Sequence, residues 1–309
     1  MHVEPLREHA LQLRASARDR VLAAARIADA AREVRPHVRG VHPEVVVAWN
    51  MRAALAAAPA LATLRSRPRL VFQHNDLLPG PLVARAVRLA ARRADITVAL
   101  SQAIADDLGL RATVVHPGVD LDRFAKAPLP ERPHALVLGA IVDWKRPELA
   151  LETVAIAARE LPDLRVTLAG EPIDAAGKEL LSQLRERAAR PDLDGRVSFP
   201  GSVDDSAAAL ANATCLLHSA DREPFGLALV EALARGRPVV APAAAGPVEI
   251  VDRSCGRLYA PGDPDAAAVA LVEAMNDADR LGTGARERAE QRFDVNSARE
   301  RWRAATRID

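Results

Sequence analysis

The sequence of 309 residues is poor in the residue types that mark specialised protein classes. Aromatic side chains make up 3% of it, so alanine, leucine and valine must build the core. The two cysteines, Cys215 and Cys255, are too few for a disulfide framework. No apolar run approaches the roughly 20 residues of a membrane span, and the first residues, MHVEPLREHALQLR, lack the apolar segment of a secretion signal. We therefore expect a cytoplasmic protein with reduced thiols.

Three common cofactor patterns are missing as well. The sequence has no G-x-G-x-x-G, which argues against a nicotinamide site, and no G-x-x-x-x-G-K-[ST], which argues against a P-loop. Its eight histidines and two cysteines show no spacing typical of a metal site. We expect neither a metal ion nor a bound cofactor.

The charges are unevenly distributed, although the formal net charge is only +1. Residues 1–130 carry 19 Lys and Arg against 12 Asp and Glu, whereas the remainder carries 23 against 29. A basic half of this kind is either a solvated arginine-rich surface or a contact for an anionic partner, and an anionic membrane surface at the inner face of the cell membrane is one such partner. We expect no nucleic-acid partner.

Short β-branched runs alternate with helical segments along most of the chain. The predicted strands are residues 44–49, 69–74, 95–100, 112–120, 135–140, 165–170, 196–201, 214–219 and 237–242. Helical patterns lie between most of them, an arginine-rich helix over 5–39 precedes them, and a charged helical stretch over 280–307 follows. This alternation predicts an α/β protein with two Rossmann-like domains, each built on a parallel sheet.

A proline-rich segment, PLPERPH at 128–134, separates the two halves and reads as a stiff linker. We therefore expect an N-terminal domain over 1–130 and a C-terminal domain over 131–285. The last residues, 286–309, are predicted to form a helix that returns to the N-terminal domain.

The segment HSADREPFGLALVEALARGRPVV, residues 218–240, holds two carboxylates in mostly apolar surroundings. Glu223 precedes the helix that begins near Gly226, at the carboxyl end of a strand, where parallel sheets bind their ligands. Free N–H groups at a helix start attract phosphate. Glu231 lies on the same helix, and a buried carboxylate there needs a donor such as a sugar hydroxyl or a nearby arginine. For Glu223, a solvated loop residue is the competing interpretation.

These residues resemble the signature of the retaining glycosyltransferases of family 4, which have the GT-B fold with two Rossmann-like domains facing a cleft. The signature places Phe-Gly and a second Glu after the first Glu, as E-P-F-G-L-A-L-V-E does here. LVLGAIVDWKRPELAL, VSFPGSVDDSAAALANATCLLHS, ADITVALSQAIADDL and VVHPGVDLDRF also resemble family segments. The resemblance runs from about residue 40 to 275.

The resemblance implies a role for each matching residue. Lys145 would neutralise the diphosphate of the donor, Glu223 would bind its hexose, and Glu231 its ribose. His74 matches an active-site histidine, although a lone histidine in QHND is otherwise typical of an exposed loop. The remaining donor-binding residues implied are Gly139 and Arg146 at the phosphates, Phe225, Gly226 and Leu227 at the helix start, and Val203 and Asp205 at the base.

The resemblance implies a metal-independent transfer of a hexose from a UDP- or GDP-sugar to an unknown lipid, saccharide or small-molecule acceptor. Two departures stand against it. Gly139-Ala140 replaces the family's Gly-Arg, and no strand with a glycine-rich loop precedes EVVVAW, since Gly40 is the first glycine. The N-terminal domain is therefore expected to be truncated. A non-catalytic nucleotide-sugar-binding protein or remnant stays open, as does a GT-B epimerase with Asp76 as its first-half carboxylate.

Overall fold

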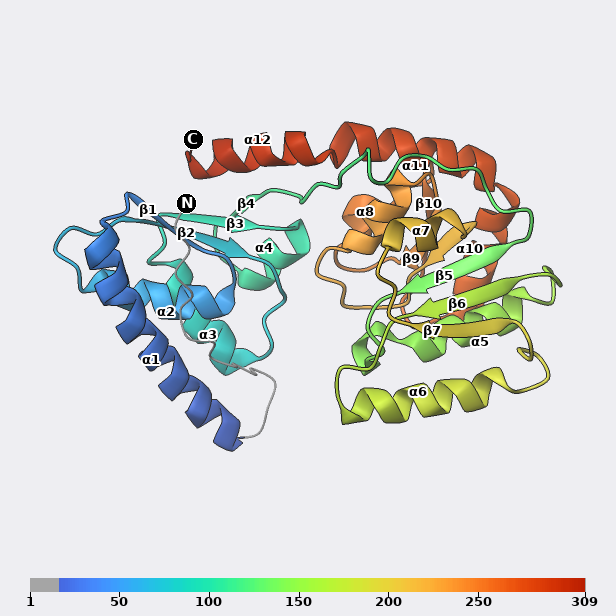
Figure 1. Ribbon diagram of the computed structural model, residues 1–309, viewed down its shortest axis with the longest axis horizontal. Helices are drawn as coiled ribbons and strands as arrows, with labels where there is room; N and C mark the ends of the chain where they lie inside the picture. The colour runs from blue at the N-terminus through green and yellow to red at the C-terminus, as the bar shows by residue number, and fades with distance from the viewer. Residues whose placement is uncertain (1–16, 309) are drawn as a thin grey trace. The chain divides into compact units, whose positions relative to one another are not determined.

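The computed structural model describes residues 17–308, with side chains from residue 25 onwards. The chain divides into two compact units (Figure 1). Unit 1 comprises Met1–His116 and Arg301–Asp309, and unit 2 comprises Pro117–Glu300. The predicted N-terminal helix corresponds to α1, Ala17–Val41, and its first part, residues 5–16, lies outside the described residues.

Unit 1 is built on a parallel sheet of four strands in the order β1-β2-β3-β4. Its strands are β1 (Val45–Ala48), β2 (Arg69–His74), β3 (Ile96–Ala99) and β4 (Thr113–Val114), and its helices besides α1 are α2 (Met51–Ala62), α3 (Pro81–Ala91) and α4 (Gln102–Leu108). The run 112–120 gives only the two residues of β4, because only Val98 and Ala99 of β3 pair with it.

Alanine allows the helices of unit 1 to pack closely. Helix α2, MRAALAAAPALA, lies against β1 and β2 and also contacts α1 and α3. Its buried Ala54 and Leu61 share one apolar cluster with Leu70 and Phe72 of β2. Strand β1 is an edge strand, and no strand among the described residues pairs with its free edge.

Unit 2 is a doubly wound domain with a parallel sheet of six strands in the order β10-β9-β8-β5-β6-β7. Its strands are β5 (His134–Leu138), β6 (Arg165–Ala169), β7 (Val197–Gly201), β8 (Cys215–Leu217), β9 (Val239–Pro242) and β10 (Gly256–Tyr259). Its helices are η1 (Asp143–Lys145), α5 (Pro147–Ala157), α6 (Ala175–Ala188), α7 (Ser206–Ala211), α8 (Leu227–Ala234), α9 (Pro247–Ile250), α10 (Pro264–Asn276), α11 (Ala278–Arg292) and the start of α12 (Val295–Thr306). The strand order reverses between β5 and β8, which makes their carboxyl ends the expected ligand site.

The units divide at residues 116 and 117, ahead of the predicted boundary at 130. Residues 117–130 group with unit 2 because they are bonded to it: the N–H of Val119 donates to the carbonyl of Phe293 at 2.7 Å. At the other end of the chain, residues 301–309 group with unit 1. There the Trp302 indole donates to the Gln73 side chain at 2.7 Å, and its ring lies 5.8 Å from that of Trp49.

Arg237 fixes residues 127 and 128 to unit 2. Its side chain is completely buried, and its guanidinium donates to the carbonyls of Ala127 and Pro128 at 2.9 and 2.6 Å. It also donates to the carbonyls of Leu210 and Ala211 at the end of α7. Burial lowers the pKa of Arg237 to about 10, which leaves the guanidinium charged at neutral pH. One buried cation therefore joins residues 127–128 to the end of α7.

We expect Arg237→Ala to lower the free energy of unfolding by about 3 kcal/mol, because four carbonyl groups lose the buried guanidinium that donates to them. Urea denaturation measures the change. Arg253→Ala removes an exposed arginine from the same unit and is the matched control, with an expected effect within about 0.5 kcal/mol. Equal effects of the two substitutions would show that the buried hydrogen bonds contribute nothing to stability.

Candidate functional site

The candidate site of unit 2 lies at the carboxyl ends of β5 and β8. Strand β5 leads to Gly139 and then to η1, which carries Lys145, while β8 leads to His218 and Ser219. The Ser219 hydroxyl donates to the carbonyl of Lys145 at 2.7 Å, so the two loops are bonded to each other. Gly139, Lys145, His218 and Ser219 line one common recess.

Gly170, at the end of β6, serves the packing of this site. A Cβ atom there would overlap the carbonyl oxygen of Gly139, so only glycine fits. For Gly170 the neighbour is the backbone of the protein itself.

Lys145 and Glu223 form the central contact of the site. The Lys145 ammonium lies 2.5 Å from a carboxylate oxygen of Glu223, and the two side chains are 21% and 11% exposed. The ammonium also lies 4.4 Å from the centre of the Trp144 ring. The N–H of Gly246 donates to the Glu223 carbonyl at 3.0 Å, which fixes the loop that carries the carboxylate. The structure thus brings together two residues that are 78 positions apart in the chain.

His218 is a further member of this group that carried no role in the sequence analysis. Its Nε2 lies 3.5 Å from the Glu223 carboxylate, and its backbone carbonyl accepts a hydrogen bond from the Tyr259 hydroxyl at 2.8 Å. Burial lowers the pKa of His218 to about 3, and the charge of Lys145 acts in the same direction. The imidazole is therefore neutral beside the ion pair. Its place at a strand end was the only signal in the sequence.

Arg146 is occupied by carboxylates. Its guanidinium contacts Glu148 at 2.5 Å and Asp221 at 2.8 Å, and these partners raise its pKa. The residue itself has a φ of +52°, a left-handed conformation between η1 and α5. A phosphate would have to compete with two carboxylates for this guanidinium.

Helix α8 begins at Leu227, one residue after Gly226, whose φ of +110° is a conformation that favours glycine. The predicted phosphate-facing residues differ in exposure. Phe225 is buried, with its ring packed edge-on against Phe293 at 6.1 Å, whereas the Leu227 side chain is 54% exposed. The mostly apolar helix therefore has an exposed leucine in its first turn.

Glu231 lies on α8 in a second polar group. The Ser206 hydroxyl donates to its carboxylate and Arg123 lies close by, while burial raises its pKa. Asp205 caps α7 by accepting from the N–H of Ala207 at 3.0 Å and lies 3.7 Å from the Arg123 guanidinium. Val203, in the loop before this cap, is half-buried. Sequence reasoning missed Arg123 and Ser206, since neither belongs to a recognisable motif.

His74 belongs to unit 1, where it is the last residue of β2. The alternative of an exposed loop residue is wrong, because its side chain is completely buried and its ring lies 5.2 Å from that of Phe72. Neither ring nitrogen has a hydrogen-bond partner, and burial lowers its pKa to about 4. His74 is therefore neutral at pH 7.

Two kinds of feature are absent from residues 17–308. No group of three or more His, Cys, Asp and Glu residues in this part of the chain is placed to hold a metal ion. No helix within it has the combination of length and hydrophobicity that a membrane crossing requires.

The depressed pKa of His74 predicts a loss of stability in acid. The folded protein holds this histidine neutral, while the unfolded chain protonates it below about pH 6.5, so its contribution is present above that pH and is lost as the pH falls towards 4. We expect this residue to account for about 3 kcal/mol of the acid destabilisation. Urea denaturation of wild type and His74→Leu from pH 7 to pH 4 should show a flatter curve for the variant. Parallel curves would contradict the assignment.

The raised pKa of Glu231 predicts the opposite dependence. The folded protein favours the protonated carboxyl group, so stability falls as the pH rises above the ordinary value of 4.5. The substitution Glu231→Gln keeps the shape of the side chain and the acceptor for Ser206 but removes the charge, so the variant should gain stability relative to wild type between pH 4 and pH 7. Urea denaturation across this range measures the gain. Glu273→Gln, which changes a more exposed carboxylate of α10, is the control and should show no such gain.

Comparison with known proteins assigns the chain to a family. Residues 119–292 match the family Glycosyl transferases group 1, and residues 4–123 match Glycosyltransferase Family 4. A D-inositol 3-phosphate glycosyltransferase of Nocardioides sp. is 37% identical over 205 residues, which are 58% of this chain and 44% of that protein. One from Streptomyces coelicolor is 33% identical over 261 residues, 74% of this chain and 55% of the other. The chain spans about half the length of these curated relatives.

Solved structures show the same fold. Anabaena HepE in complex with UDP and glucose superposes with a TM-score of 0.80 at 22% identity, covering 92% of this chain and 82% of HepE. Sucrose-phosphate synthase from Thermosynechococcus elongatus gives a TM-score of 0.78 at 19% identity, with 92% and 78% covered. The family match covers more than half of the chain, and two parallel-sheet α/β units carry the fold. The protein is thus a member of the glycosyl transferases group 1 family and has the GT-B fold.

Proposed function

We propose that the protein transfers a hexose from a nucleotide sugar, UDP- or GDP-linked, to an acceptor, with retention of configuration and without a metal ion. The observation that carries this proposal is the contact between Lys145 and Glu223 at the strand-order reversal of unit 2. It places one cation and one carboxylate where a Rossmann-like domain binds its ligand. In the free protein these two residues are paired with each other, and a bound donor would provide a new partner for each.

The diphosphate of the donor would be drawn to Lys145. Lysine offers a compact charge with three donors, and the first-turn N–H groups of α8 add the partial positive charge of a helix start. A diphosphate would compete with Glu223 for the ammonium. The carboxylate released in this way could accept hydrogen bonds from hexose hydroxyls, because carboxylate oxygens are strong acceptors.

The nucleoside would occupy the second polar group. Glu231 can accept hydrogen bonds from ribose hydroxyls, and Ser206 and Arg123 already hold its carboxylate in place. Asp205 and Val203 lie in the loop before α7, which we propose borders the base. The binding of UDP and glucose by HepE supports a donor of this class.

Transfer requires stabilisation of the departing diphosphate more than a strong nucleophile. Lys145 and the start of α8 would provide it, since preorganised positive groups stabilise charge that develops in the transition state. The resemblance assigns a role at the reacting centre to His74 as well, whose side chain in unit 1 is neutral and completely buried. The curated relatives are named for D-inositol 3-phosphate, so an inositol phosphate is the first acceptor to test.

Substitution of the central pair tests the proposal. Lys145→Ala should reduce donor turnover, measured as release of UDP or GDP, by about a hundredfold or more, because one of the few groups that stabilise the leaving diphosphate is lost. Glu223→Gln keeps the shape of the side chain but weakens its acceptor strength, and should reduce turnover to a similar extent. Lys178→Ala, an exposed lysine on α6, is the matched control and should keep wild-type turnover.

The outcomes separate the alternatives. Unchanged turnover in both site variants would refute the assignment of these residues. Calorimetric binding of a nucleotide sugar without turnover against any acceptor would favour a non-catalytic binding protein. The anomeric configuration of the product, read by NMR, tests retention independently, and an inverted product would contradict it.

A further inference from the structure

A large basic pocket lies in unit 1 at the amino ends of β1 and β2. Its volume is about 940 Å³. Two segments of the chain line it: the first contributes Arg35, Val38, Arg39, His42, Pro43 and Glu44, and the second is residues 63–68. His74, the catalytic candidate of this unit, lies at the opposite, carboxyl end of β2. The pocket is therefore separate from the strand ends where GT-B sites are expected.

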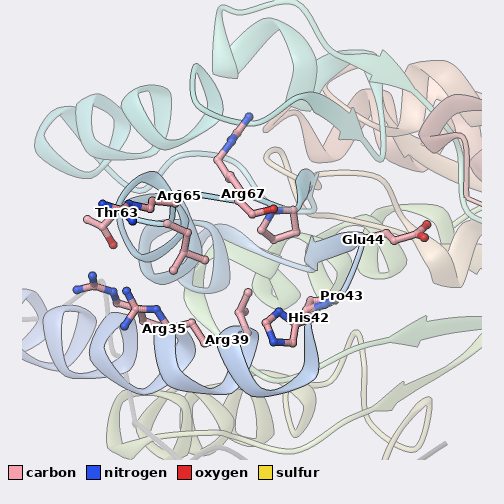
Figure 2. A pocket seen from close by; sticks show the side chains of 12 residues that line it. Arg35, Arg39, His42, Pro43, Glu44, Thr63, Arg65 and Arg67 are labelled. Carbon is pink, nitrogen blue, oxygen red and sulfur yellow. The ribbon is translucent and has the colours of Figure 1, made fainter.

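Two elements bring the cations of the pocket together. Arg35 and Arg39 are one turn apart near the end of α1, so their side chains lie on the same face of the helix. The loop between α2 and β2 adds Arg65 and Arg67. Figure 2 shows the arginines of α1 on one side and Thr63 and Arg65 across from them.

Most of this positive charge is not neutralised by the protein. Arg67 is paired with the Asp95 carboxylate at 2.5 Å and also donates to the Arg93 carbonyl. For the side chains of Arg35, Arg39 and Arg65, the described part of the chain provides no ion pair or hydrogen bond. Glu44 is the one acidic residue of the lining, and Figure 2 shows its carboxylate directed away from these arginines.

Arg35 carries the sharpest indication of a ligand. Its Nε atom is buried and has no hydrogen-bond partner. A buried donor without an acceptor is costly, and such a group in a native protein calls for an explanation such as an ion. Three guanidinium groups around one open space would each repel the others unless an anion lies between them.

The end of α1 presents one more donor to the pocket. His42 follows the helix with a φ of +49°, a left-handed conformation that is uncommon for a residue with a side chain. Its N–H donates to the Val38 carbonyl at 3.0 Å and so closes the helix. In Figure 2 the His42 ring lies between the arginines of α1 and Pro43.

From this geometry we infer that the pocket around Arg35, Arg39 and Arg65 binds a phosphate group. Guanidinium groups match the oxygen pairs of phosphate with two parallel hydrogen bonds, which makes arginine the preferred residue for this anion. The volume lies within the range of about 300–1,000 Å³ that is usual for small-molecule sites, so the phosphate is carried by a larger molecule. The inference is independent of the proposed donor site, whose residues belong to unit 2.

Calorimetry with inorganic pyrophosphate as the probe tests the site. Arg35→Gln should weaken binding about tenfold, because one charge-assisted contact is worth about 1.4 kcal/mol or more. Arg32→Gln removes the same charge from an exposed position of the same helix, outside the pocket, and should leave binding unchanged. Thermal unfolding of both variants confirms that they are folded.

Two further arms identify the source of the signal. The titration is repeated on Lys145→Ala, since that lysine offers pyrophosphate a second place to bind, and the signal that depends on Arg35 should persist there. Co-sedimentation with phosphatidylcholine vesicles, with and without phosphatidic acid, tests a lipid headgroup as the carrier of the phosphate. Vesicle binding that requires phosphatidic acid and is lost in Arg35→Gln supports the site with a headgroup as its ligand, whereas pyrophosphate binding alone supports a soluble one.

Two results would overturn the inference. The first is the absence of binding to both pyrophosphate and phosphatidic acid vesicles. The second is equal weakening by Arg32→Gln and Arg35→Gln, which would show that the helix attracts anions only through its general charge.

Discussion

The ion pair of Lys145 and Glu223 determines the arrangement of the loops in unit 2. Both charges are largely removed from water, and neither would be stable there without the other. Their backbones are held by the Ser219 hydroxyl and by the N–H of Gly246, so the loops that follow β5, β8 and β9 converge on one point. Because a buried ion pair contributes little net stability, its presence at the reversal of the strand order fits the donor-binding role proposed for it.

Local sequence patterns predicted most of the fold. The apolar run RLVFQH became a buried strand because helices with apolar faces cover it, whereas VVVA forms an edge strand that is only partly buried. Helix α7 begins directly after Asp205, whose side chain caps it. The predicted first and last residues of a strand were less accurate where its pairing with a neighbouring strand sets its length. Strand β4 is short because only two residues of β3 pair with it.

The candidate site was predictable only where a motif carried it. Lys145 and Glu223 were named from motifs, but their direct contact depends on the strand order and could not be read from either segment alone. Other features of the site also depend on residues far apart in the chain. Examples are the ion pair of Arg146 with Asp221, the burial of His74 and the position of Arg123 near Glu231. The two units divide ahead of the predicted boundary for the same reason, since the hydrogen bonds of a buried arginine attach residues 127–128 to unit 2.

Gly170 shows how such long-range packing affects the interpretation of related sequences. A Cβ atom at this position would overlap the carbonyl oxygen of Gly139, so any side chain would displace the strand end that borders Lys145. Evolutionary pressure on position 170 would therefore be as strict as on a residue that touches the ligand. If relatives keep a glycine at this strand end, the reason would be the close contact between two backbone segments. A search for ligand-binding residues based on invariance alone would include this glycine in error.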